Sequence, residues 1–210
     1  MKFSLVLALA SAMAMPVLSS ASTLTWNFLN DVPGNSSGVA VTSPHSFTDT
    51  QGDSTTIVAS VVFGPANAKL YEKKGGGDEN GLGIYGLDDN EIDTRSEVKL
   101  DLNSLLALNP ASIAVSLGSV QSGEGGFIQY GNTFYGFGVY DESSHVLNLS
   151  TLSKNGGFIN VFATGGNVLI GSITATPGAQ APEPANLALA GAGLIALGCI
   201  ARRKFAQQKQ

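Results

Sequence analysis

Residues 96–102 read SEVKLDL, and charged and apolar side chains alternate strictly from Glu97 onward. Because successive side chains of a β-strand point to opposite faces, the pattern predicts a strand that buries Val98, Leu100 and Leu102. The charged residues between them then face solvent. A strand with one buried and one solvated face is typical of an antiparallel sheet that packs on a hydrophobic core.

The segments on either side predict further short strands and no long helix. Thr55–Phe63 (TTIVASVVF) is rich in β-branched residues, and a Gly-Pro pair ends it. The other predicted strands are Leu24–Leu29, Ala68–Lys73, Ile113–Val120, Thr133–Tyr140, Val146–Leu149, Gly157–Ala163 and Val168–Thr174. Ser104–Leu108 predicts a single helical turn. Many short strands without crossover helices predict an all-β fold, an antiparallel β-sandwich of jelly-roll type, over residues 22–176.

The N-terminus has the pattern of a cleavable signal peptide. Lys2 supplies a basic start, and Phe3–Leu18 is an apolar stretch. Ser19, Ser20 and Ala21 are small residues of the kind that signal peptidase recognises, so cleavage is predicted after Ala21. Residues 1–21 are therefore expected to direct the chain out of the cytoplasm and then to be removed.

The C-terminal segment combines three features in order. Residues 177–184 form a linker that ends in Pro182, Glu183 and Pro184, and the two prolines favour an extended backbone that is open to another protein. Residues 185–201 carry no charge and predict a transmembrane helix close to the minimum length of about 17 residues. The tail, residues 202–210, begins with Arg202, Arg203 and Lys204, which predict a cytoplasmic stop signal.

This order of Pro-Glu-Pro, apolar helix and basic end resembles the PEP-CTERM sorting signal of Gram-negative bacteria. The resemblance implies that an exosortase, a membrane-embedded cysteine transpeptidase, cuts near Pro182–Pro184 and transfers or releases the domain. It also implies an inner-membrane intermediate and a final place at the cell surface or in the extracellular matrix. Family members are typically exported by species that make extracellular polysaccharide. Exosortase and signal peptidase are then the expected processing partners.

The charge of the exported part limits its partners. Between Ser22 and Thr176 there are six basic and fifteen acidic residues, a net charge of −9 against −5 for the whole chain. Such an acidic surface argues against nucleic acid as a partner. The single cysteine, Cys199, lies in the predicted membrane helix. The exported domain therefore has no disulfide and must depend on its hydrophobic core.

An acidic loop is a candidate calcium site, the one cofactor that the sequence suggests. Its proposed ligands are Asp88, Asp89, Asn90, Asp93 and Glu97. Calcium takes about 6–8 oxygen ligands, which carboxylates and amides can supply. The spacing does not match an EF-hand, because no glycine follows Asp93 at the position of the sharp turn. A solvated loop without an ion is the alternative interpretation.

An aromatic stretch offers a candidate sugar-binding surface. Strand alternation places Phe134 and Tyr140 on one face with two glycines between them, and Tyr130 precedes them by a few residues. Aromatic rings of this kind can stack on the apolar faces of sugars. Packing within the core is the alternative for the same side chains.

The sequence lacks the common motifs of hydrolytic enzymes. Neither Gly-x-Ser-x-Gly nor His-Glu-x-x-His occurs, and His45 and His145 are predicted in exposed turns. We therefore expect a non-enzymatic exported protein of the cell surface or extracellular matrix, associated with exopolysaccharide or biofilm. The alternatives are a secreted carbohydrate-active hydrolase or lyase and a calcium-stabilised adhesion module.

Overall fold

The computed structural model describes residues 22–34, 36–51, 55–76, 79–138, 141 and 143–178. The predicted signal peptide, the Pro-Glu-Pro motif, the C-terminal apolar segment and the basic tail lie outside the described residues. Among the described residues, no helix is long and apolar enough to span a membrane.

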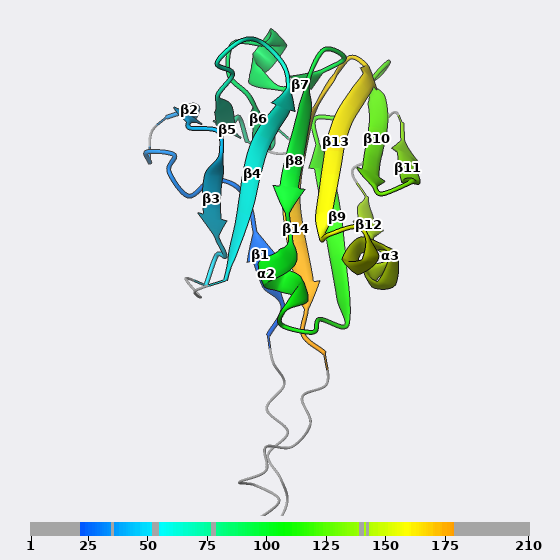
Figure 1. Ribbon diagram of the computed structural model, residues 1–210. Coiled ribbons are helices and arrows are strands. Elements are labelled where there is room, and N and C mark those ends of the chain that lie inside the picture. Colours follow the sequence, from blue (N-terminus) through cyan, green and yellow to red (C-terminus); the bar gives the residue numbers. More distant parts are fainter. Residues whose placement is uncertain are drawn as a thin grey trace, which may run out of the picture. The chain divides into compact units, whose positions relative to one another are not determined.

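Two antiparallel β-sheets, here called sheet A and sheet B, face each other. Sheet B lies in front in Figure 1. In sheet A the order is β12-β9-β14-β6-β5-β2, and β1 and β7 also pair with β14. In sheet B the order is β11-β10-β13-β8-β4-β3. The prediction of an all-β fold built from antiparallel sheets is confirmed.

The strands of sheet A are β1 (Leu24–Trp26), β2 (Gly38–Val41), β5 (Leu70–Lys74), β6 (Asn80–Ile84), β7 (Ile92–Asp93), β9 (Ser112–Gly118), β12 (Ser144–Val146) and β14 (Asn167–Thr176). Those of sheet B are β3 (His45–Thr48), β4 (Thr56–Phe63), β8 (Glu97–Asp101), β10 (Gly125–Tyr130), β11 (Thr133–Phe137) and β13 (Phe158–Gly165). The described helices are short: η1 (Asp88–Asn90), α2 (Asn103–Leu106) and α3 (Leu149–Lys154).

The core lies between the sheets, and β8 contributes to its centre. This strand is flanked by β4 and β13, and its inward residues Val98 and Leu100 are fully buried, as is Leu102 just after it. They belong to one hydrophobic cluster with residues of sheet A, among them Leu117 and Ile170. The alternation of SEVKLDL therefore predicted the orientation of this strand correctly.

The first strand is shorter than predicted. Trp26 is its last residue, because Phe28 adopts a φ of 53°, which an extended strand does not contain. Both rings are nevertheless fully buried. The alternation of this segment therefore identified two core residues correctly, although the backbone leaves the sheet between them.

The first and last strands of the domain are neighbours. Leu24 of β1 lies opposite Ala175 of β14, and residues from Ser22 to Gly178 form one compact unit. The last strand ends at Thr176, whose carbonyl accepts a hydrogen bond from the Ala111 N–H at 2.8 Å. The chain thus enters and leaves this unit at adjacent points.

Several elements differ from the expected strands. The sequence did not predict β2, β3, β6, β7 or β10, because these strands are short or contain glycine. The predicted strand Val146–Leu149 is divided: β12 ends at Val146, and α3 begins at Leu149. The helix begins there because the Asn148 side chain accepts a hydrogen bond from the Thr151 N–H at 3.0 Å, which caps the first turn.

Candidate functional site

The outer face of sheet B carries a row of aromatic rings. Phe127 of β10 lies directly opposite Phe162 of β13, with ring centroids 5.8 Å apart. Phe134 of β11 meets Phe127 edge-on at 5.9 Å and is 54% exposed. Gly136, which lies opposite Phe127 on β11, has no side chain to cover that ring. Three rings from three neighbouring strands therefore form one continuous surface, here called the aromatic face.

A shallow depression of about 290 Å³ lies beside these rings. Its lining includes the amide side chains of Gln129, Asn155 and Asn160, together with Lys99 and Phe158. The Lys99 ammonium lies 3.5 Å from the centre of the Phe158 ring, a cation–π contact that holds both side chains in place. The arrangement places apolar rings beside hydrogen-bonding amides.

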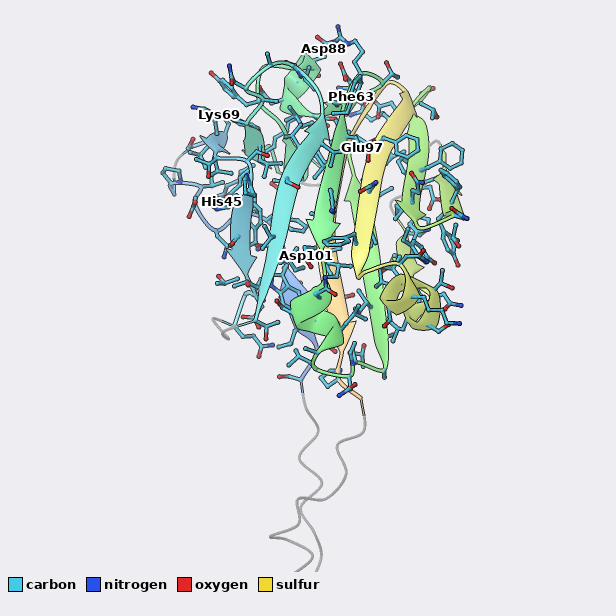
Figure 2. The ribbon with its side chains drawn as sticks, in the orientation of Figure 1. His45, Phe63, Lys69, Asp88, Glu97 and Asp101 are labelled. Carbon is cyan, nitrogen blue, oxygen red and sulfur yellow. The ribbon has the colours of Figure 1, made fainter. Side chains whose placement is uncertain are left out.

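The charged residues of β8 border this surface at two points. Figure 2 shows Glu97 and Asp101 at opposite ends of the strand. Burial raises the pKa of Glu97. The two carboxyl groups belong to residues four apart on one strand, so their Cα atoms are about 13 Å apart.

The predicted sugar-binding residues are only partly available for that role. Phe134 is exposed on the outer face, so the alternative of packing within the core does not apply to this ring. Tyr130 is 1% exposed and points into the core, where its ring stacks on Tyr135 and its hydroxyl accepts a hydrogen bond from the Asn148 N–H at 3.2 Å. Its buried ring cannot stack on a ligand, although Tyr130 is among the residues that line the depression. The rings that lie beside Phe134 on the outer face are those of Phe127 and Phe162. Tyr140 lies outside the described residues.

The predicted calcium ligands do not converge. Asp88 and Asp89 are exposed on η1, and the Asn90 side-chain oxygen accepts a hydrogen bond from the Gly86 N–H at 2.9 Å. Asp93 is buried and paired with Arg95. Burial alone would raise the Asp93 pKa, but the hydrogen bonds from Arg95 outweigh it and hold that pKa below its usual range. Glu97 lies apart from them on the outer face of sheet B.

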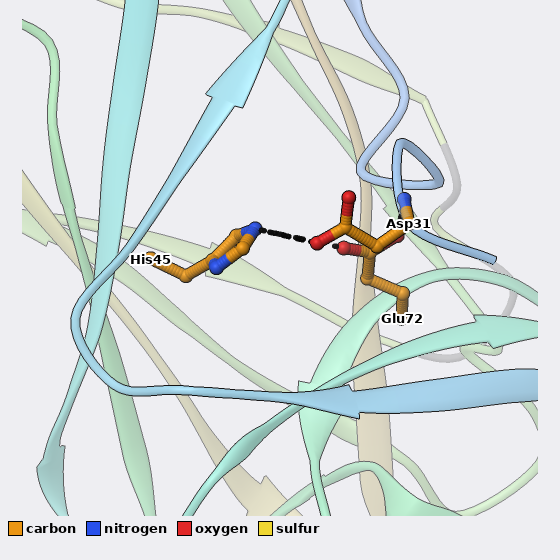
Figure 3. Close-up of side chains that lie close together, drawn as sticks. All are labelled: Asp31, His45 and Glu72. Carbon is orange, nitrogen blue, oxygen red and sulfur yellow. Dashed lines mark hydrogen bonds and ion pairs between the residues drawn. The ribbon is translucent and has the colours of Figure 1, made fainter.

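The two histidines do not lie in exposed turns. His45 is the first residue of β3 and is partly buried facing Asp31 and Glu72 (Figure 3). His145 is in β12, and its Nε2 lies 3.7 Å from an Asp141 carboxylate oxygen. The polar residues around each histidine concealed these strands, because both are short strands at the edge of a sheet.

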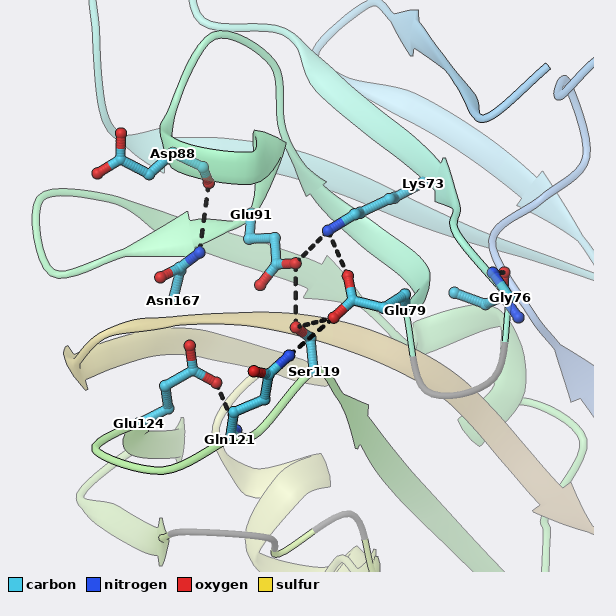
Figure 4. A network of polar contacts seen from close by, with 10 residues as sticks. Lys73, Gly76, Glu79, Asp88, Glu91, Ser119, Gln121, Glu124 and Asn167 are labelled. Carbon is cyan, nitrogen blue, oxygen red and sulfur yellow. Dashed lines mark hydrogen bonds and ion pairs between the residues drawn. The ribbon is translucent and has the colours of Figure 1, made fainter.

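A second polar network joins four segments of the chain around Lys73 (Figure 4). The Lys73 ammonium lies between the carboxylates of Glu79 and Glu91. The Ser119 hydroxyl lies 3.0 Å from an oxygen of each carboxylate and can donate to one of them at a time. Gln121 donates to Glu79 at 2.9 Å. The network thus links β5 and the residues before β6, before β7 and after β9.

The pKa values of the two carboxyl groups in this network are shifted in opposite directions. Hydrogen bonding to Lys73 lowers the pKa of Glu79. Glu91 is 1% exposed, and burial raises its pKa to about 7 even though Lys73 acts against that change. One oxygen of Glu91 is buried without a hydrogen-bond partner. A single lysine therefore compensates fully for only one of its two acids.

Comparisons with protein-family models, curated proteins and solved structures returned no significant match to this chain.

Glu91 predicts a specific pH dependence of stability. Its folded-state pKa lies above the ordinary value of 4.5. Its protonation therefore stabilises the fold fully below pH 4.5, and that contribution is lost as the pH rises toward and through 7. Glu91→Gln should remove this loss, about 2–3 kcal/mol between pH 5 and 8. Urea unfolding of both proteins across this range measures the difference.

Asp89→Asn, which removes an exposed carboxylate, is the control for the Glu91 variant. A wild-type stability curve parallel to that of Glu91→Gln would contradict the assignment.

Proposed function

We propose that this chain is an exported, non-catalytic protein of the cell surface or extracellular matrix that associates with exopolysaccharide or biofilm. The observation that carries the proposal is the ordered C-terminal segment: Pro182-Glu183-Pro184, then an uncharged stretch over residues 185–201, then Arg202-Arg203-Lys204. With a signal peptide at residues 1–21, the apolar stretch would hold the chain in the inner membrane until an exosortase removes it.

The position of the last strand supports removal of the tail. The final strand, β14, ends at Thr176, six residues before Pro182. Cleavage at the motif would therefore leave every described strand and the whole described core in place. The released or transferred domain would keep its fold, as a sorting signal requires.

We further propose that the domain is a jelly roll. The strands β8-β13-β10-β11 are adjacent in sheet B, and β7-β14-β9-β12 are adjacent in sheet A. From β7 to β14, the chain passes between the sheets in the order expected when two Greek keys wind around one core. This topology occurs in lectin domains among others, and it is compatible with a binding role.

The aromatic face and the depression beside it are proposed as the polysaccharide-binding surface. The rings of Phe127, Phe134 and Phe162 would stack on sugar faces, while Gln129 and Asn160 would hydrogen-bond to hydroxyls.

The mass of the mature protein from the producing cells tests the sorting proposal. We expect a chain that begins at Ser22 and ends close to the Pro182–Pro184 motif. Glu183→Ala removes the only charge of the motif and should leave the tail attached, whereas Asp89→Asn in the domain should not affect processing. A wild-type mass that extends to Gln210 would contradict the proposal and indicate a membrane-anchored protein.

Affinity for the producer's own polysaccharide tests the aromatic face. Phe134→Ala removes an exposed ring and should weaken binding about tenfold, equivalent to about 1.4 kcal/mol. Val146→Ala is the matched control, because Val146 is similarly exposed, at 57%, but lies on sheet A. Equal binding of wild type and both variants in affinity electrophoresis would remove this face from the proposal. Release of reducing ends during the assay would favour the hydrolase alternative.

A further inference from the structure

Asp31, His45 and Glu72 come together from three separate segments (Figure 3). Asp31 lies in the connection between β1 and β2, His45 opens β3 in sheet B, and Glu72 occupies the middle of β5 in sheet A. The strand β3 is at the edge of its sheet, and β5 is next to the edge strand β2. The three residues therefore link the two sheets along one side of the core.

Their donor atoms are spaced as the ligands of a small cation are. His45 Nε2 lies 3.1 Å from Asp31 Oδ2 and 3.9 Å from Glu72 Oε1. One donor atom from each residue lies within 4.8 Å of the other two. Ligands about 2.0–2.2 Å from a tetrahedral zinc ion are roughly 3.3–3.6 Å apart, so shifts of about 1 Å would complete the geometry.

Glu72 provides an independent sign that a partner belongs here. Its side chain is fully buried, and its Oε2 accepts a hydrogen bond from the Asp31 N–H at 2.8 Å. Its Oε1, which faces His45, is buried and has no hydrogen-bond partner. A buried carboxylate oxygen without a partner is unfavourable. A cation between these side chains would satisfy that oxygen.

The imidazole is held in position by packing. The His45 ring meets the Phe47 ring edge-on with centroids 4.8 Å apart, and Phe47 in turn meets Phe28 at 5.1 Å. Both phenylalanines are fully buried. These contacts hold the ring so that its Nε2 points at the two carboxylates. A site arranged in this way loses little conformational entropy when it binds.

The donor set selects the class of cation. One imidazole nitrogen and two carboxylates suit zinc and related first-row divalent ions, whereas calcium takes about 6–8 oxygen ligands. The Asp31 side chain is 50% exposed, which leaves room for water to complete the coordination.

We propose that Asp31, His45 and Glu72 bind one Zn²⁺ ion, which joins the edges of sheets A and B. The ion would cross-link the two sheets of a domain that has no disulfide, at a place where loops connect those sheets. This inference does not depend on the sorting signal or on the aromatic face.

The purified mature protein is first treated with EDTA and dialysed to remove bound metal. Titration of this protein with zinc then tests the proposal. Calorimetry with ZnCl₂ should give one equivalent of bound ion. At a free zinc concentration about a hundred times Kd, the midpoint of thermal unfolding should rise by about 5–10 °C. Calcium chloride at the same concentration should give a much smaller rise.

Three variants locate the binding. His45→Ala and Asp31→Asn should each weaken zinc binding at least tenfold, and far-UV circular dichroism shows whether both remain folded. Asp31→Asn should disturb folding less, because asparagine has nearly the shape of aspartate and the side chain is half-exposed. His145→Ala, at the second histidine of the chain, should bind like the wild type. The proposal is overturned if the wild type does not bind millimolar zinc, or if folded Asp31→Asn and His45→Ala bind it as tightly as the wild type.

Discussion

The packing of two sheets on one hydrophobic core is the constraint on which the structure depends. Residues 22–176 contain no cysteine, so no disulfide can join the sheets. A domain of about 150 residues buries roughly 70% of its extended-chain surface, which makes a stable core possible without one. Within this domain, β8 turns Val98 and Leu100 inward and Lys99 outward. The same alternation that builds the core therefore places a lysine in the depression beside the aromatic face.

The strand β5 shows how alternation distributes charge. Leu70 and Glu72 are buried on one side of the strand, and Lys73 lies on the other side. Glu72 therefore reaches His45 between the sheets, while its neighbour Lys73 forms ion pairs with Glu79 and Glu91. The acids that face His45 and Lys73 lie on β5 and on the segments near it. The phenylalanine rings of the aromatic face lie on β10, β11 and β13. The face on β10, β11 and β13 thus brings rings and amides together, with Lys99 in the depression beside them.

The sequence predicted those features that depend on local alternation. The burial of Val98 and Leu100, and the position of Phe134 on the strand face opposite to Tyr135, follow from a period of two and needed no knowledge of the fold. Features that depend on pairing between distant strands could not be predicted in this way. Tyr130 belongs to β10, which the sequence did not identify as a strand, so its inward direction was missed. His45 and Glu72 are 27 residues apart in the sequence and meet only because β3 and β5 lie in facing sheets.

The capping of α3 by Asn148 is a local signal that the sequence did contain and that a pattern of apolar residues concealed. The Lys73 network is different, because its members come from four segments and no motif connects them. The central proposal about binding is that the outer face of sheet B, with its three phenylalanines, recognises polysaccharide. Backbone amide chemical shifts of the isotopically labelled domain, measured during titration with soluble fragments of the producer's polysaccharide, test it most directly. The claim predicts shift changes concentrated in β10, β11 and β13 and at Lys99 of β8. Changes confined to sheet A, or none at saturating fragment, would contradict it.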